Sequence, residues 1–276
     1  LAGRPMSHHA TQRVIVRMLY DPAFVALVYD DVDAALGDDA LTADERKMVV
    51  AVDRRAWGLD PYRRSRSLAA LLEELPASSA LATVALGGVA GLDGFFSSER
   101  FHRGIQTRGS LVDAYAAWIS DGGGPQAGAT SVLERGLARA RRRRTSGLGA
   151  MSEGATVWHA LAPQAWAGTA PGGSLALFTG VLGRLAQVSP SASAAVIAGT
   201  VDLSGLPDLS GEPFGVIAEI GSEGASIGEG PAELVALLEA SVSPLPRAAL
   251  VARAGALGAE DAAEEVLDDL VHQGLL

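Results

Sequence analysis

Imidazole is the side chain best suited to bind a metal or to move a proton near neutral pH, and the chain contains five. No two of them are spaced by three or four residues, as on one face of a helical metal site, and no HExxH motif occurs. The five are His8, His9, His102, His159 and His272. The absence of cysteine excludes thiolate zinc, cysteine-held iron–sulfur clusters and a cysteine nucleophile. We therefore predict that this chain alone forms no metal site and holds no cofactor.

The motifs that hold phosphate or activate a serine are missing as well. The only lysine, Lys47, lies outside any GxxxxGK[ST] loop, so a P-loop is excluded. The glycine pairs Gly221/Gly224 and Gly228/Gly230 enclose glutamates where a phosphate cradle needs bare amide groups, which favours turns between strands. No GxSxG elbow occurs. These observations predict a protein that is not an enzyme. Of the functions considered for this chain, a cofactor-free enzyme ranks last, because no acid, base and nucleophile come together in a recognisable pattern.

Charge is divided unevenly along the chain. Residues 151–276 hold fifteen acidic and three basic side chains, whereas residues 1–150 hold seventeen acidic and nineteen basic ones. Such asymmetry between halves indicates two parts with different partners. We expect a first domain at 6–150, with Met6 as the natural start, and a second at 151–276. Neither a membrane-spanning apolar run nor a signal peptide is recognisable, which predicts a cytoplasmic protein.

In the first half of the chain, the sequence predicts helices as the elements that would position a functional site. Asp21-Pro22 is a strong helix start, because Asp accepts a hydrogen bond at the N-cap and Pro is tolerated at the first helical position. Thr42–Glu45 has the spacing of a capping box, and Asp60-Pro61 indicates a further start. A helix over Ser131–Arg144 ends in four arginines. These arginines either meet phosphate or an acidic surface, or form a solvated helix end that complements the helix dipole.

The second half changes to a mixed pattern. Leu175–Val188 favours a short helix, whereas Ser193–Leu203 and Phe214–Ile220 are typical of strands, and Ala225–Ile227 is expected to be a third. Three helical patterns close the chain at Pro231–Ala240, Pro246–Ala256 and Ala259–Gln273. The predicted fold class is α+β, with an N-terminal helical domain followed by a winged-helix-like domain of three strands and three helices.

A winged helix that reads DNA carries basic side chains on its recognition helix. The last helical pattern instead carries six carboxylates, which oppose the phosphate contacts that dominate DNA affinity: Glu260, Asp261, Glu264, Glu265, Asp268 and Asp269. An exposed strand edge in such a module accepts a peptide as an added strand, and an acidic helix beside it favours basic residues. From the winged-helix pattern we expect peptide contacts at Ile217, Glu219, Ser226, Ile227, Glu264, Asp268 and His272.

Several stretches, besides the closing helical segment, carry a resemblance to a known group of proteins. They are Asp21-Pro-Ala-Phe24, Leu41-Thr-Ala-Asp-Glu-Arg46, Phe95-Phe-Ser-Ser-Glu-Arg-Phe-His102, Tyr115-Ala-Ala-Trp118 and Leu133-Glu-Arg-Gly-Leu-Ala-Arg-Ala140. With these stretches, the upstream part is similar to partner proteins of multinuclear non-heme iron-dependent oxidative enzymes, as in methanobactin- and thiaglutamate-type pathways. The closing segment resembles the precursor-recognition winged helices of ribosomally synthesised, post-translationally modified peptide (RiPP) pathways.

The resemblance implies a non-catalytic partner subunit that forms a heterodimer with the iron enzyme and presents a precursor peptide to it. The iron then belongs to the enzyme. The helical domain would dock on the enzyme, and the expected docking residues are Phe95, Phe96, Phe101, His102, Arg141 and Arg142. The alternative that stays open is a winged-helix transcriptional regulator, in which the Arg141–Arg144 helix would touch DNA.

Overall fold

A computed structural model describes residues 8–37, 39–107, 109–144, 152–153, 156–222, 224–259 and 261–276. The chain divides into two compact units, each formed by separate stretches of sequence. Unit 1 comprises Leu1–Gly124 and Leu185–Val201, and unit 2 comprises Pro125–Arg184 and Asp202–Leu276. The chain therefore passes between the units three times, at residues 124/125, 184/185 and 201/202.

This division differs from a boundary at residue 150. The helix α10 (Pro125–Arg144) packs on two strands of unit 2, so the contacts assign it to the second unit rather than to the first. A later stretch, residues 185–201, packs back on unit 1. A boundary drawn from composition and charge cannot detect either exchange, because the assignment of both segments depends on tertiary contacts with residues distant in the sequence.

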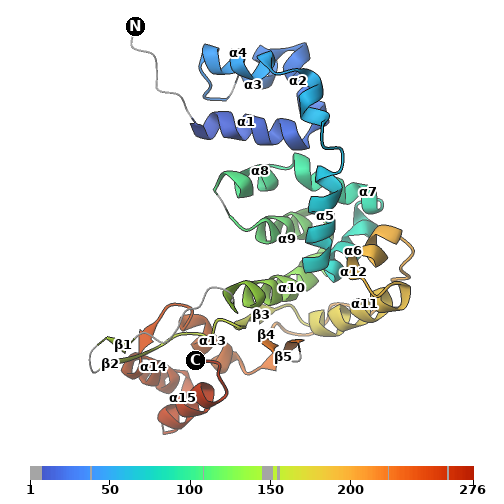
Figure 1. Ribbon diagram of the computed structural model, residues 1–276. Coiled ribbons are helices and arrows are strands. Elements are labelled where there is room, and N and C mark those ends of the chain that lie inside the picture. Colours follow the sequence, from blue (N-terminus) through green and yellow to red (C-terminus); the bar gives the residue numbers. More distant parts are fainter. Residues whose placement is uncertain are drawn as a thin grey trace. The chain divides into compact units, whose positions relative to one another are not determined.

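Unit 1 is helical throughout its described residues (Figure 1). Two of its helices begin where the sequence predicts. Asp21 caps α2 by accepting from the Phe24 amide, and Thr42 and Glu45 form a complete capping box at α4. The helices are α1 (His8–Tyr20), α2 (Pro22–Asp30), α3 (Val32–Leu36), α4 (Ala43–Ala51), η1 (Arg54–Gly58), α5 (Arg63–Glu74), α6 (Pro76–Ala85), α7 (Val89–Leu92), η2 (Asp93–Ser97), α8 (Glu99–Gln106), α9 (Leu111–Gly122) and α12 (Ala192–Ala198).

Aromatic rings form the centre of unit 1. Phe95 contacts Phe96, Phe101 and Tyr115 at centroid distances of 5.5, 5.3 and 5.0 Å, and Tyr20 stacks on Phe96 at 5.4 Å. Phe95, Phe96, Phe101 and Tyr115 are fully buried. Edge-to-face and offset contacts of this kind stabilise beyond the area that the rings bury. The cluster therefore joins α1, η2, α8 and α9 into one core.

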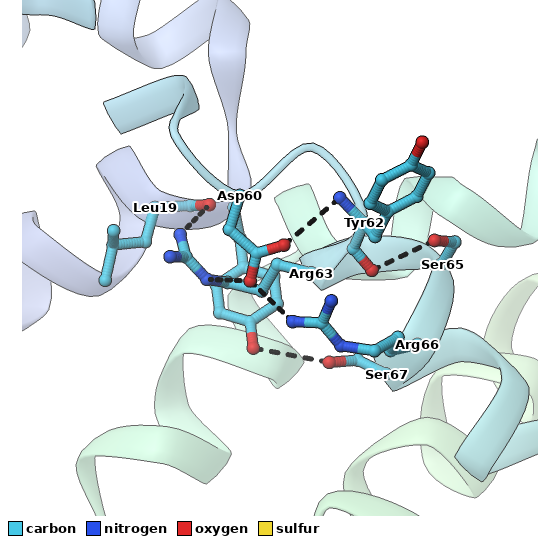
Figure 2. A network of polar contacts seen from close by, with 8 residues as sticks. Leu19, Asp60, Tyr62, Arg63, Ser65, Arg66 and Ser67 are labelled. Atoms are coloured by element: carbon cyan, nitrogen blue, oxygen red, sulfur yellow. Dashed lines mark hydrogen bonds and ion pairs between the residues drawn. The ribbon is translucent and has the colours of Figure 1, made fainter. Parts of the chain in front are cut away.

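The start of α5 is held by a polar network rather than by a predicted cap. The helix begins at Arg63, two residues after Pro61, and the Asp60 carboxylate accepts from the Tyr62 amide at 3.2 Å and from Arg66 at 2.5 Å. Figure 2 shows Arg63 reaching in the other direction, to the Leu19 carbonyl at 3.1 Å. The hydrogen bond from Arg66 is the main reason why the pKa of Asp60 is lowered. One carboxylate and two guanidiniums thus connect α5 to the end of α1.

The helix α12 is the returning segment of unit 1 and packs on α5 and α6. Its capping residue Ser191, together with Ser193, donates to the Glu73 carboxylate of α5. These bonds, that from Ser193 first, hold the pKa of Glu73 below its ordinary value. The prediction of a strand at Ser193–Leu203 was wrong. The run is apolar enough for either element, but Ser191 caps a helix and Gly199 ends it with a φ of 64°, which favours glycine.

Unit 2 combines helices with two small antiparallel sheets. The expected strand at Phe214–Ile220 and the third strand at Ala225–Ile227 are confirmed, and the three closing helices are present with shifted ends. Besides α10, the elements are β1 (Ser152–Glu153), β2 (Thr156–His159), β3 (Ala165–Ala170), α11 (Ser174–Val188), β4 (Phe214–Gly221), β5 (Gly224–Gly230), α13 (Ala232–Ala240), β6 (Leu245–Pro246), α14 (Arg247–Ala254), the short π-helical turn η3 (Gly255–Ala259) and α15 (Ala263–His272).

The sheet β3-β4-β5 lies between α10 and the closing helices, as Figure 1 shows. On one face, Trp166 packs so closely on Gly136 of α10 that a Cβ there would lie 2.3 Å from the ring. On the other face, Ala165 and Ala167 join a buried cluster with Leu238 and Leu267 of the closing helices. Successive strand residues face opposite sides, so each face of the sheet has its own helical cover.

The described residues thus form a mixed α+β molecule that is mostly helical, with small antiparallel sheets. Within the described ranges, no single helix is long and apolar enough to span a membrane. The bent pair formed by Arg54–Glu74 and Pro76–Ala85, with 114° between them, satisfies that test only on length and composition.

Candidate peptide-binding site

Strand β5 forms one edge of the sheet β3-β4-β5. It pairs with β4 along its whole length, from Gly215 opposite Gly230 to Gly221 opposite Gly224. Ala225, Ser226 and Glu229 are exposed, and a Cβ added at Gly228 would meet nothing within 4 Å. An edge strand of this kind presents backbone donors and acceptors that a further strand can pair with. The geometry therefore suits the addition of an extended peptide.

An apolar cavity of about 280 Å³ begins where β5 ends. Pro231, which directly follows β5, is part of its wall, and the other walls come from α13, α14, η3 and α15. Its volume is close to the lower limit of about 300 Å³ for small-ligand pockets, which is enough for an apolar side chain. The remaining lining residues are Glu233, Leu234, Leu237, Ala254, Leu257, Ala259 and Val266.

Three carboxylates lie at or near this edge and cavity. Glu229 lies exposed on β5, and Glu233 lines the cavity. On α15, Asp269 follows the cavity residue Val266 by three positions, which places it about 60° away around the helix. Asp269 is exposed. The edge strand, the cavity wall and α15 thus each carry one of these three carboxylates.

The predicted α15 contacts lie on a different side of that helix. Glu264 and Asp268 are each about 160° away from Val266 around the helix axis. Both accept from Arg247 of α14, at 2.6 and 2.9 Å, and the hydrogen bond to Glu264 is the main reason why the pKa of Arg247 is raised. His272 is exposed in the last turn of α15. The structure therefore does not bring Glu264 and Asp268 to the cavity. Both carboxylates form ion pairs with Arg247 on another side of α15.

The predicted contacts on the sheet are neighbours, but they do not share one face. Glu219 lies opposite Ser226 in the register of β4 and β5, on the same face as Ile217. Ile217 packs against the buried cluster of the closing helices. Ile227 lies opposite Ala218, on the other face of the sheet. Of these four residues, Ser226 and Ile227 belong to the edge strand itself.

The expected docking residues need a correction. Phe95, Phe96 and Phe101 are fully buried in unit 1, so they offer no surface to a partner, and the physical reason is their mutual ring packing. Arg141 and Arg142 are exposed on α10, but this helix belongs to unit 2. The three phenylalanines therefore drop out of the expected docking surface. The resemblance placed these phenylalanines on a surface, yet all three rings turn to the same core.

His102 is the remaining expected docking residue. It is half-buried on α8, and neither ring nitrogen has a hydrogen-bond partner among the described residues. Burial and then the nearby Arg17 lower the pKa of His102 to about 4, against the smaller opposing effect of Asp21. Its imidazole is therefore neutral at physiological pH.

Sequence reasoning did not predict a cavity at Glu233, Leu257 and Val266. Val266 belongs to the apolar stripe of the last helix, but a stripe predicts burial and cannot show where the packing leaves a gap. Among the described residues, no group of three or more His, Asp or Glu side chains is arranged to hold a metal ion. No protein-family model, no curated protein and no solved structure matches this chain.

Proposed function

We propose that this protein binds an extended peptide along the free edge of β5 and presents it to a partner enzyme, without carrying out chemistry itself. In the fuller form of this proposal, the C-terminal part of unit 2 acts as a winged-helix-like recognition module. The ligand is the precursor peptide of a RiPP pathway, and the partner is an iron-dependent oxidative enzyme. The observation that carries the proposal is the exposed edge strand that leads directly into an apolar cavity.

The two features complement each other in what they supply. Main-chain hydrogen bonds along β5 would give affinity that is independent of sequence, whereas a pocket for a side chain gives selectivity. Since the cavity begins at Pro231, a peptide that extends along β5 toward Gly230 would bring a side chain to its mouth. Glu229, Glu233 and Asp269 would favour basic residues next to that apolar anchor.

A test can be made without knowing the natural peptide. Peptides are selected from a random display library against the full chain, and the selected sequence is synthesised with single N-methyl groups at successive residues. Strand addition engages every second amide of the peptide, so N-methylation at alternate positions should weaken binding about tenfold or more, while the positions between them stay unaffected. Uniform tolerance of N-methylation would contradict strand addition.

The cavity can be tested on the protein. Leu257→Glu places a charge in the apolar cavity and should weaken the same peptide at least tenfold, because a buried unpaired charge is costly. Val242→Glu is the matched control, since Val242 is an exposed apolar residue of unit 2 outside the cavity. Equal affinity of the two variants would exclude the cavity as the anchor site.

The partner is tested separately by co-expression with a candidate iron-dependent oxidative enzyme, followed by size-exclusion chromatography. The proposal predicts a heterodimer that survives purification and retains peptide binding. If peptide binding is found but no such enzyme ever co-purifies, the presentation role fails, while the peptide site stands. Salt-dependent binding to random duplex DNA, with no peptide selected, would favour the winged-helix regulator instead.

A further inference from the structure

Unit 1 contains a second cavity, independent of the peptide site, with a volume of about 400 Å³. Helix α1 forms one wall with Arg13, Val14 and Arg17, and α2 contributes Phe24. The opposite wall comes from α8, with His102 and Gln106. One wall of the cavity thus combines guanidiniums with apolar groups, and the opposite wall carries an imidazole and an amide.

The two arginines lie one turn apart on the same face of α1. Arg13 forms only a long ion pair with Asp39, at 3.6 Å, and Arg17 a long ion pair with Asp21, at 3.8 Å. Within the described part of the chain neither guanidinium donates a hydrogen bond, and the buried Nε of Arg13 has no partner. Arg17 lies over the Phe24 ring at 3.8 Å, which fixes its position.

Planar guanidiniums are well matched to carboxylates, and hydrogen bonds to charged groups are stronger than neutral ones. The other charges of the cavity set the charge of its ligand. Asp39 and Glu99 also line it, so two positive and two negative side chains face it. Glu99 pairs with Arg103 outside the wall. A dianion such as phosphate would meet these carboxylates, whereas a single negative charge can be bridged between Arg13 and Arg17.

We propose that this cavity of unit 1 binds a small monocarboxylate with an apolar body, its carboxylate held by Arg13 and Arg17 and its body placed against Val14 and Phe24. The neutral ring of His102 fits the role of a wall beside the ligand, since it adds no further positive charge. Gln106 supplies an amide donor at the same wall. This site goes beyond peptide binding and does not depend on it.

The test uses benzoate as the probe on the full chain, with isothermal titration calorimetry. Benzoate is expected to bind saturably with one site per chain, whereas benzamide, which has the same shape and no charge, should bind at least tenfold more weakly. Arg13→Gln and Arg17→Gln should each weaken benzoate about tenfold or more, as expected when one charge-assisted contact is lost. Arg55→Gln is the matched control, because Arg55 is an exposed arginine of unit 1 that does not line the cavity.

The position of the ligand is read by NMR on the imidazole protons of His102, with the exposed His272 as the internal reference. The ring current of bound benzoate should shift the His102 signals and leave those of His272 unchanged. This measurement needs no variant, so it decides the matter even if a substituted protein folds poorly. Three results would each overturn the proposal. The first is equal affinity for benzoate and benzamide, and the second is equal benzoate affinity of Arg17→Gln and the parent chain. The third is the absence of any benzoate-induced change in the chemical shifts of the His102 imidazole protons. Tighter binding of inorganic phosphate than of benzoate would overturn the monoanion preference.

Discussion

At the scale of single residues, unit 1 holds a histidine whose environment opposes its charge. His102 is half-buried beside the guanidinium of Arg17, and its ring nitrogens lack partners among the described residues. Its folded-state pKa of about 4 lies below the ordinary value of 6.5. Between these two values the unfolded chain binds a proton that the folded chain does not. The free energy of unfolding therefore falls as the pH is lowered through this window.

His102→Phe should remove this pH dependence. Phenylalanine keeps a ring in the same place and cannot be protonated, so the variant should be more stable than the parent at pH 4–5, by up to about 3 kcal/mol, and less different at pH 8. Chemical denaturation at a series of pH values measures this difference. His272→Phe, at an exposed position, is the control and should leave the pH dependence unchanged. If the free energy of unfolding of the parent and of His102→Phe changed with pH in the same way, His102 would not be the source of the pH dependence.

At the scale of elements, the contact between the Trp166 ring and the backbone of α10 sets how closely this helix packs on the sheet of unit 2. The Trp166 side chain fills the space that side chains at Gly136 and Gly168 would need, since a Cβ at either position would lie 2.3–2.4 Å from its ring atoms. The helix α10 can therefore approach strand β3 only because residue 136 has no side chain. Overpacking at such a contact forces the helix away from the sheet.

Gly136→Ala should destabilise unit 2 by about 1–3 kcal/mol, as is usual for overpacked cores. The matched control is Gly183→Ala in α11, where the added methyl group meets nothing within 4 Å. There the higher helix propensity of alanine should leave stability unchanged or raise it by up to about 1 kcal/mol. Thermal unfolding of both variants tests this, and a Gly136→Ala protein as stable as the control would show that α10 adjusts without cost.

The elements also show what local sequence can and cannot predict. Caps and edges are local, so Asp21, the Thr42–Glu45 box and the strands around Phe214 and Ala225 are correctly predicted. The run at Ser193–Leu203 has no periodicity that separates a helix from a strand, and its partner, Glu73, lies more than a hundred residues away. Short apolar runs are ambiguous for that reason, because tertiary contacts choose their conformation.

The candidate site follows the same rule. The edge strand and its residues Ser226 and Ile227 are present where the pattern predicts a strand. The cavity next to it could not be predicted, because it results from how α13, α14, η3 and α15 pack. Its carboxylates also differ from the expected ones: Glu264 and Asp268 bind Arg247, a pairing between two helices that spacing within one helix cannot reveal.

At the scale of the whole molecule, the two units redistribute the charge. Unit 2 contains sixteen acidic and nine basic side chains, and unit 1 contains sixteen and thirteen, because α10 brings six arginines to the acidic unit. The difference in net charge between the two units is therefore much smaller than the difference between the two halves of the sequence. Acidity is instead a local property of residues 202–276, which contain β4, β5 and the closing helices.

The division into units can be tested with a charge placed in α12. Val196 is buried in unit 1, whereas Ile197, its neighbour on the same helix, is half exposed. Val196→Asp should destabilise unit 1 by several kcal/mol and raise hydrogen exchange in α5 and α6, while exchange in β3, β4 and β5 stays at the parental rate. Ile197→Asp should change neither. Faster exchange in the sheet than in α5 would contradict the assignment of α12 to unit 1.

The return of α12 has a consequence for how the protein is made. On the ribosome the chain emerges from its N-terminus, and domains generally fold in that order. The core of unit 1 stays incomplete until residue 198 has emerged, because α12 covers α5 and α6. By then α10, β3 and α11 of unit 2 have already been synthesised, yet β4 has not. Unit 1 is therefore completed only after part of unit 2 has been made, and unit 2 only after unit 1 is complete. Neither unit can finish folding during translation before part of the other has been synthesised.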